Sequence, residues 1–103
     1  GGDLSTLLFE NTELELGWRF RTTLASQIAE GLEYLHSQKV LHRDMKSENV
    51  LLDEAWTPKI ADFGFARPIE GDGKYRMSIC GTDEYMAPEL MFDENYGYPA
   101  DVF

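Results

Sequence analysis

The strongest constraint on the fold is a change in hydrophobic period near residue 39. Before it, leucine and isoleucine recur at spacings of four, four and three over residues 24–35. This spacing predicts a half-buried helix from about residue 16 or 17 to residue 37. After it, short runs rich in branched residues alternate with polar loops, which is typical of brief strands. The expected strands are 40–41, 50–52 and 59–61. The pattern therefore predicts an α+β fold.

Weaker signals predict the remaining elements. Asp3 can cap a short helix whose apolar side would be formed by Leu4, Leu7 and Leu8. Gly31 inside the long helix costs about 1 kcal/mol relative to Ala, so another element is expected to pack closely against it. The other expected features are a hairpin-like turn at 53–56, a long loop over 67–85 and short helices at 88–91 and 100–103.

Charge and composition restrict the classes of partner. The chain carries 19 acidic and 9 basic residues, which gives a net charge of −10. Nucleic-acid binding requires Lys and Arg to displace counterions from phosphates, so no nucleic-acid partner is expected. No apolar run has the length of a membrane span, which predicts no membrane segment. The single cysteine, Cys80, cannot form an internal disulfide, and this favours a reducing, cytoplasmic location.

Two polar clusters carry the candidate chemistry. The first is HRDMKSEN at residues 42–49, and alone such residues are usually solvated turn residues. Asp62 follows the next strand, 13 residues after Asn49, so both are expected with Asp44 at one edge of a small sheet. A carboxylate with an amide oxygen suits Mg²⁺, which takes its remaining ligands from water and phosphates. Asp44, two positions before Lys46, suits proton acceptance from a hydroxyl beside a cation.

These motifs together resemble a eukaryotic protein kinase catalytic domain. They are His-Arg-Asp at 42–44 with Asn49, Asp-Phe-Gly at 62–64 and Ala-Pro-Glu at 87–89, in that family's order and spacing. The resemblance covers essentially the whole chain and implies a single partial kinase domain over residues 1–103. This part would be a piece of the mostly helical C-terminal lobe, from the end of the hinge to the helix after Ala-Pro-Glu. The chain ends look cut, so we expect the N-terminal lobe to lie outside the chain and the fragment alone to be inactive.

The resemblance assigns roles to the catalytic residues and implies ATP and Mg²⁺ as cofactors. Asp44 would accept the proton of the substrate hydroxyl, and Lys46 would contact the γ-phosphate. Asn49 would hold one Mg²⁺. Asp62 would hold the metal ion that bridges the phosphates.

Further nucleotide contacts are implied by the same resemblance. Leu51 would form the floor under the adenine ring. Asp3 would bind the ribose hydroxyls, a role that is compatible with its capping of the first helix. Glu48 belongs to the same cofactor-binding set, although it could equally favour basic residues in a protein substrate or be solvated.

Arg43 implies regulation, because kinases with an arginine before the catalytic aspartate pair it with a phosphorylated residue of the activation loop. Ser78 occupies the usual position for that phosphate. The alternatives are that Ser78 is an ordinary loop serine, or that Tyr75, the weaker candidate, carries the phosphate. The implied partners are therefore a protein substrate and either an upstream activating kinase or a second copy that autophosphorylates in trans.

The resemblance also implies structural contacts around the catalytic loop. Thr82 is expected to bond near the catalytic aspartate and lysine. Phe63 and His42 would belong to a hydrophobic spine that is anchored by Asp101 at the start of the next helix.

The subclass rests on fewer residues. Lys46 and Thr82 resemble the serine/threonine pattern, and the ending at 100–103 resembles the tyrosine-kinase-like group of serine/threonine enzymes. Three hypotheses remain open. The chain is part of an active serine/threonine kinase, of a pseudokinase that acts as a scaffold or binding module, or of a tyrosine or dual-specificity kinase.

Overall fold

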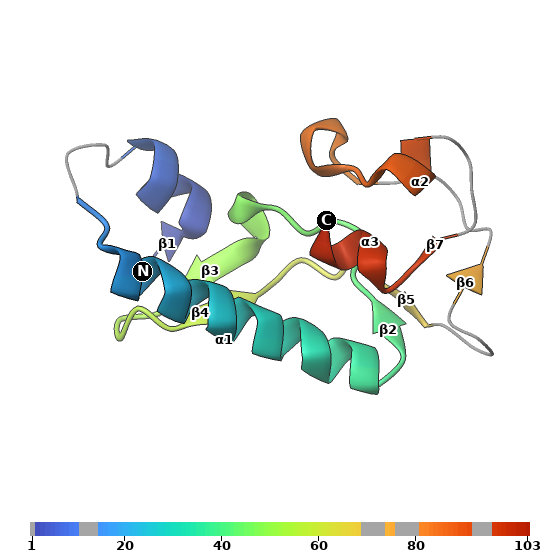
Figure 1. Ribbon diagram of the computed structural model, residues 1–103, viewed down its shortest axis with the longest axis horizontal. Helices are drawn as coiled ribbons and strands as arrows, with labels where there is room; N and C mark the ends of the chain where they lie inside the picture. The colour runs from blue at the N-terminus through green and yellow to red at the C-terminus, as the bar shows by residue number, and fades with distance from the viewer. Residues whose placement is uncertain (1, 11–14, 69–73, 76–80, 92–95) are drawn as a thin grey trace. The chain divides into compact units, whose positions relative to one another are not determined.

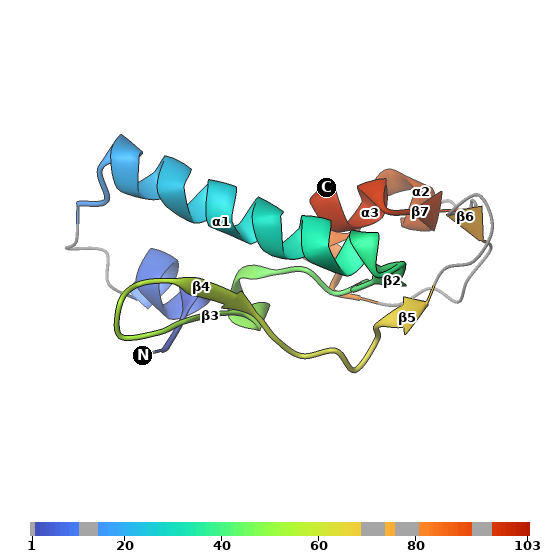
Figure 2. The ribbon, with the colours of Figure 1, turned by 90° about the horizontal axis from the view of Figure 1, so that it is seen from below.

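The computed structural model describes residues 2–10, 15–68, 74–75, 81–91 and 96–103. The chain divides into two compact units, Gly1–Glu33 with Ser47–Ala61 and Tyr34–Lys46 with Asp62–Phe103. Both units combine helix with short strands (Figure 1 and Figure 2). This mixture confirms the α+β class that the change of period predicts.

The long predicted helix is present as α1, Trp18–Ser37. Its leucines at 24 and 32 are buried, in agreement with the predicted apolar face. Gly31 lies on the same helix, and a Cβ added there would be 3.0 Å from the Cδ1 atom of Ile60. The close approach of another element at Gly31 is therefore confirmed.

The first unit contains a three-stranded antiparallel sheet in the order β1-β3-β4. The strands are β1 Gly2–Asp3, β3 Val50–Leu52 and β4 Pro58–Ile60. The connection between β3 and β4 is the predicted turn, because the Trp56 N–H donates to the Asp53 carbonyl at 3.0 Å. Trp56 has a φ of 63°, in the left-handed region. In β3 the outer residues are buried and the central Leu51 is exposed, as expected for a strand with one face on a core.

A short helix, Thr6–Glu10, follows β1. The Thr6 N–H donates to Asp3 Oδ1 at 2.7 Å, so the predicted capping contact is present. Leu7 is buried with Leu24 and Leu52 in the core of this unit. The prediction that Leu8 shares this face is wrong, because its side chain is 44% exposed. The segment Thr6–Glu10 is a π-helix, so its residues do not follow the α-helical spacing on which that prediction rests.

The described residues of the second unit form two separate strand pairs and several short helical turns. The strands β2 Val40–Leu41 and β5 Arg67–Pro68 are antiparallel, as are β6 Lys74–Tyr75 and β7 Tyr96–Gly97. The short helices are Asp83–Tyr85, α2 Pro88–Met91 and α3 Pro99–Val102. The core of this unit contains Leu41, Ala87, Leu90 and Tyr96.

Two expectations about the strands need correction. Residues 67–85 are not one structureless loop, since they contain β5, β6 and the turn Asp83–Tyr85. The single sheet edge expected to collect the polar clusters is present only in part. The Ala61 N–H, directly after β4, donates to the Asn49 carbonyl, directly before β3, at 2.8 Å. The strand β2, which precedes Asp44, belongs to a different sheet. The pairing partners of these strands are distant in sequence, and local hydrophobic patterns do not encode them.

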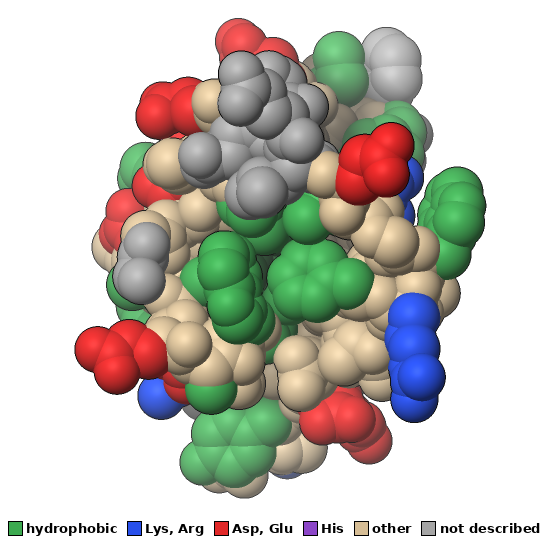
Figure 3. Space-filling view, turned by 90° about the vertical axis from the view of Figure 1, so that its left-hand side faces the viewer, with side chains coloured by type: hydrophobic (Ala, Val, Ile, Leu, Met, Phe, Trp, Pro, Cys, Tyr) green, Lys and Arg blue, Asp and Glu red, His purple; other side chains and the backbone are tan. Residues whose placement is uncertain are grey.

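Hydrophobic side chains gather on the face of the molecule drawn in Figure 3. In the first unit a cavity of about 270 Å³ is lined by Leu7, Leu16, Phe20 and Trp56, with Glu15 and Gly17. The rings of Phe20 and Trp56 meet edge to face at a centroid distance of 6.1 Å.

Among the residues that the structure describes, no helix has both the length and the apolar character of a membrane span.

Candidate active site

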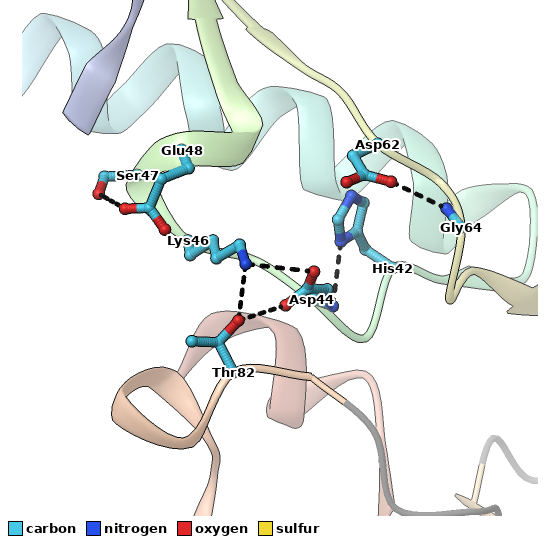
Figure 4. A network of polar contacts seen from close by, with 8 residues as sticks. All are labelled: His42, Asp44, Lys46, Ser47, Glu48, Asp62, Gly64 and Thr82. Atoms are coloured by element: carbon cyan, nitrogen blue, oxygen red, sulfur yellow. Dashed lines mark hydrogen bonds and ion pairs between the residues drawn. The ribbon is translucent and has the colours of Figure 1, made fainter. Parts of the chain in front are cut away.

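Three residues that the sequence predicts to be functional lie together in the second unit (Figure 4). The Thr82 hydroxyl donates to Asp44 Oδ1 at 3.0 Å. Lys46 Nζ donates to Thr82 Oγ1 at 2.7 Å and lies 3.7 Å from Asp44 Oδ2. The contact expected for Thr82 is therefore present. The result is a carboxylate held between a hydroxyl and an ammonium group.

The backbone around Asp44 is fixed by buried polar contacts. The Asp44 N–H donates to Nδ1 of His42 at 3.1 Å, and His42 is fully buried. The N–H groups of His42 and Arg43 donate to Oδ2 and Oδ1 of Asp101, each at 2.9 Å. The rings of His42 and Phe63 meet edge to face with centroids 5.3 Å apart. These contacts match the anchoring expected for Asp101.

Asp101 has a further partner that sequence reasoning did not find. His36, in the last turn of α1, places Nε2 at 2.9 Å from Asp101 Oδ2. The two residues are 65 positions apart, so no local pattern joins them. A histidine at the end of an amphipathic helix is more often a cap or a packing residue. The Asp101 carboxylate thus accepts from a side chain and from two consecutive peptide groups.

The backbone of Arg43 takes an unusual conformation that requires a glycine opposite it. Arg43 has a φ of 70°, and Gly81 has a φ of 108°. A Cβ on Gly81 would lie 2.9 Å from the Arg43 carbonyl oxygen. Gly81 is therefore needed both for its backbone conformation and for the close approach of the two segments.

The side chain of Arg43 is buried, and two of its hydrogen bonds go to neutral oxygen acceptors. Its Nε donates to the Phe65 carbonyl at 2.7 Å, and one terminal nitrogen donates to the Tyr96 hydroxyl at 2.9 Å. The sequence predicts that Arg43 receives a phosphate on Ser78. Ser78 lies outside the described residues, so this pairing stays a prediction. Tyr96 was not identified from the sequence, because a buried tyrosine after a short helix resembles an ordinary core residue.

The two predicted metal ligands lie in different units. Asn49 is buried in the turn Ser47–Asn49 of the first unit. Asp62, in the second unit, has a φ of 59°, and its Oδ1 accepts the Gly64 N–H at 3.3 Å. An amide oxygen and a carboxylate are ligands that suit Mg²⁺. In the described part of the chain no group of three or more His, Cys, Asp or Glu side chains could hold a metal ion. The role of Asn49 and Asp62 as metal ligands stays a prediction.

The predicted nucleotide contacts belong to the first unit. Asp3 and Leu51 are register partners on β1 and β3, so the structure brings them side by side. The Leu51 side chain is exposed and available for contact, whereas Asp3 already uses Oδ1 to cap the Thr6 N–H. The Oε1 atom of Glu48 accepts the Ser47 hydroxyl at 3.0 Å. Their roles toward a nucleotide stay predictions.

A polar loop that buries an aspartate beside a lysine and a threonine is the kind of site that a phosphotransferase domain carries. Comparison with known families agrees with this class, because the protein kinase domain family matches residues 1–103. The chain belongs to the protein kinase domain family. The partial kinase-like fold inferred from the motifs is thereby confirmed.

Individual relatives give the same result. A probable serine/threonine-protein kinase of Dictyostelium discoideum is 48% identical over the whole chain, which covers 24% of that relative. The RasGEF domain-containing serine/threonine-protein kinase X of the same organism is 41% identical over the whole chain and 11% of its own length. Receptor-like protein kinase HAIKU2 of Arabidopsis thaliana is 46% identical over 88% of the chain and 10% of its own length. The chain thus spans a quarter or less of these relatives.

Proposed function

We propose that this chain carries the catalytic loop of a serine/threonine protein kinase that transfers the γ-phosphoryl group of ATP to protein hydroxyls. The observation that carries the proposal is the contact among Asp44, Lys46 and Thr82. It combines a proton acceptor with a cation in one small, mostly buried group. A cavity of about 30 Å³ beside Asp44, lined also by Tyr85 and Phe103, gives the carboxylate a neighbouring space.

The proposed reaction has ATP and the substrate hydroxyl as its only reactants. The substrate hydroxyl oxygen forms a bond to the γ-phosphorus while the bond from that phosphorus to the β,γ-bridging oxygen breaks. The hydroxyl proton passes to the Asp44 carboxylate, and ADP leaves with the bridging oxygen. Asp44 orients the hydroxyl, and Lys46 offsets negative charge on the transferring oxygens.

The resemblance implies that Asn49 would hold one Mg²⁺ and that Asp62 would hold the metal ion at the phosphates. Such ions would supply positive charge that offsets the charge of the phosphates. Asp62 is suited to this role because Oδ1 of its carboxylate accepts a hydrogen bond from the Gly64 N–H. This bond orients the carboxylate. Asp3, Glu48 and Leu51 would contribute the nucleotide contacts described above.

The serine/threonine subclass is supported by Lys46 and Thr82, since the lysine bonds directly to the threonine. Two relatives named as serine/threonine-protein kinases support the same subclass. Three further predictions belong to this proposal. They are membership of the tyrosine-kinase-like group, phosphorylation on Ser78 by an activating kinase or in trans, and a cytoplasmic location.

The test is a peptide-array phosphorylation assay with the full-length protein, ATP and Mg²⁺. Asp44→Asn serves as the matched control, because it removes the proton acceptor and keeps the shape of the side chain. We expect phosphoserine and phosphothreonine with the native protein and a loss of about 100-fold or more with the variant. Phosphotyrosine as the main product would overturn the subclass. No signal from either protein would support a scaffold without catalysis, and equal signals from the two would overturn the role of Asp44 as proton acceptor.

A further inference from the structure

The hydroxyl of Tyr96 touches the catalytic loop from a distant part of the sequence. Tyr96 is 2% exposed and packs in the core of the second unit with Leu41 and Leu90. Its oxygen accepts a hydrogen bond from Arg43, 53 residues earlier, at 2.9 Å. The backbone of Tyr96 is paired with Tyr75 in the β6–β7 ladder. Core packing and strand pairing thus fix the position from which the hydroxyl acts.

Arg43 is fixed at several points, and each contact comes from a different segment. Its peptide N–H is bound by Asp101, and its Nε is bound by the carbonyl of Phe65. A guanidinium is a rigid planar fork, so acceptors at two of its nitrogens set its orientation as well as its position. The Phe65 carbonyl and the Tyr96 hydroxyl are therefore two ends of one clamp on the Arg43 side chain.

The clamp matters for Asp44 because Arg43 precedes it directly in the chain. Arg43 holds a left-handed φ of 70°, which costs free energy in a residue with a Cβ and must be maintained by its surroundings. Loss of one acceptor from a buried cation would let the guanidinium move and would weaken the hold on this conformation. A shift at Arg43 would be passed on through the shared peptide group to Asp44.

We propose that Tyr96 is a positioning residue for phosphoryl transfer and acts through Arg43. The proposal rests on the proposed kinase function of Asp44. The Tyr96 oxygen is a neutral acceptor inside the core, so this hold on Arg43 does not require a phosphate on the activation loop. It differs in that respect from the phosphate pairing that the sequence predicts for Arg43.

The experiment uses Tyr96→Phe in the full-length protein, which removes the hydroxyl and keeps the ring. Tyr98→Phe is the matched control. Tyr98 lies two positions away, and its hydroxyl makes no hydrogen bond to the residues that the structure describes. Initial rates are measured well below the Tm of every variant, so that differences in folded fraction do not enter.

We expect Tyr96→Phe to lower kcat about tenfold and to leave the KM for ATP within about twofold, because orientation at the reacting centre is lost while nucleotide binding is kept. Tyr98→Phe is expected to stay within about twofold in both. If Tyr96→Phe keeps the kcat of the control, the positioning role is wrong.

A double-mutant cycle tests the contact separately from catalysis. Thermal unfolding is measured for Tyr96→Phe alone, for Arg43→Met alone and for the pair. We expect Tyr96→Phe to lower the Tm by several degrees in the native protein. In the protein that already carries Arg43→Met, we expect the same substitution to lower the Tm by less than half as much. Additive changes would overturn the contact. A native protein without kinase activity but with coupled changes would overturn the proposed function and the positioning role, and would leave the clamp standing.

Discussion

Lys46 and Thr82 are 36 residues apart, yet Lys46 Nζ donates a hydrogen bond to Thr82 Oγ1 at 2.7 Å. The same hydroxyl donates to Asp44 Oδ1 at 3.0 Å. Thr82 therefore joins the proposed cation to the proposed base and sets the distance between them. The contact also requires residues 81–82 to lie against the catalytic loop. The arrangement around Asp44 depends in this way on a segment that contributes no proposed chemistry of its own.

The first prediction concerns this hydroxyl. Thr82→Val removes it and keeps the shape of the side chain, so Asp44 and Lys46 lose their shared partner. We expect kcat to fall between about 10- and 100-fold, as for a small misplacement of reacting groups. The measurement is steady-state kinetics with a peptide substrate. Thr82→Ser keeps the hydroxyl and is expected to retain most of the activity. Equal losses in both variants would show that the hydroxyl is not what matters.

The second prediction concerns Gly81. Gly81→Ala places a Cβ 2.9 Å from the Arg43 carbonyl oxygen, at a residue whose φ is 108°. We expect a loss of unfolding free energy of about 1–3 kcal/mol, measured by urea denaturation. Gly17→Ala is the control, because a Cβ there meets no atom within 4 Å. If the two variants were equally stable, the close approach at Gly81 would be in doubt.

The third prediction concerns the acceptor that holds the start of the catalytic loop. Asp101→Asn replaces one carboxylate oxygen by an NH₂ group. An NH₂ group cannot accept the hydrogen bonds that His36, His42 and Arg43 donate to Asp101. We expect a loss of unfolding free energy of about 2–4 kcal/mol, because hydrogen bonds to a buried charge are stronger than neutral ones. Asp83→Asn, in the short helical turn Asp83–Tyr85 where no residue is buried, is the control and is expected to change little. The unfolding free energies of both variants are measured by chemical denaturation, with circular dichroism as the signal.

The fourth prediction concerns the packing of α1 against β4. Gly31→Leu forces a large side chain toward Ile60, whose Cδ1 lies 3.0 Å from the place that even a single Cβ at residue 31 would take. We expect a loss of about 1–3 kcal/mol from overpacking, despite the better helix propensity of leucine. Ile60→Ala in the same protein is expected to recover part of this loss. Purely additive effects, measured by thermal unfolding, would contradict direct contact between the two positions.

Sequence patterns predicted the elements whose signals are local. The helix α1 was found because its leucines repeat at helical spacing, and the turn after β3 was found because polar residues separate two apolar runs. The pairings of β5 and β6 were missed, since each pairs with a strand far away in the chain. Neither Arg67–Pro68 nor Lys74–Tyr75 contains the branched apolar run that marked Val40–Leu41, so no local pattern indicated these two strands.

The candidate site shows the same division. Asp44, Lys46 and Asn49 stand in one short motif and were identified by their family resemblance. His36 and Tyr96 were not identified, because each acts through a contact 53 or 65 residues away. A histidine in a helix and a tyrosine in a core have ordinary packing roles, and only the fold shows which polar atoms they meet.

The Asp101 anchor has a consequence for how this loop can change in evolution. Asp101 holds residues 42 and 43 by their peptide N–H groups, which every amino acid except proline possesses. The side chain of Arg43 is held by other atoms altogether. A substitution at Arg43 therefore removes the side-chain clamp but leaves these two backbone hydrogen bonds in place. Position 101 is more restricted, because its two backbone hydrogen bonds need the two oxygens of a carboxylate.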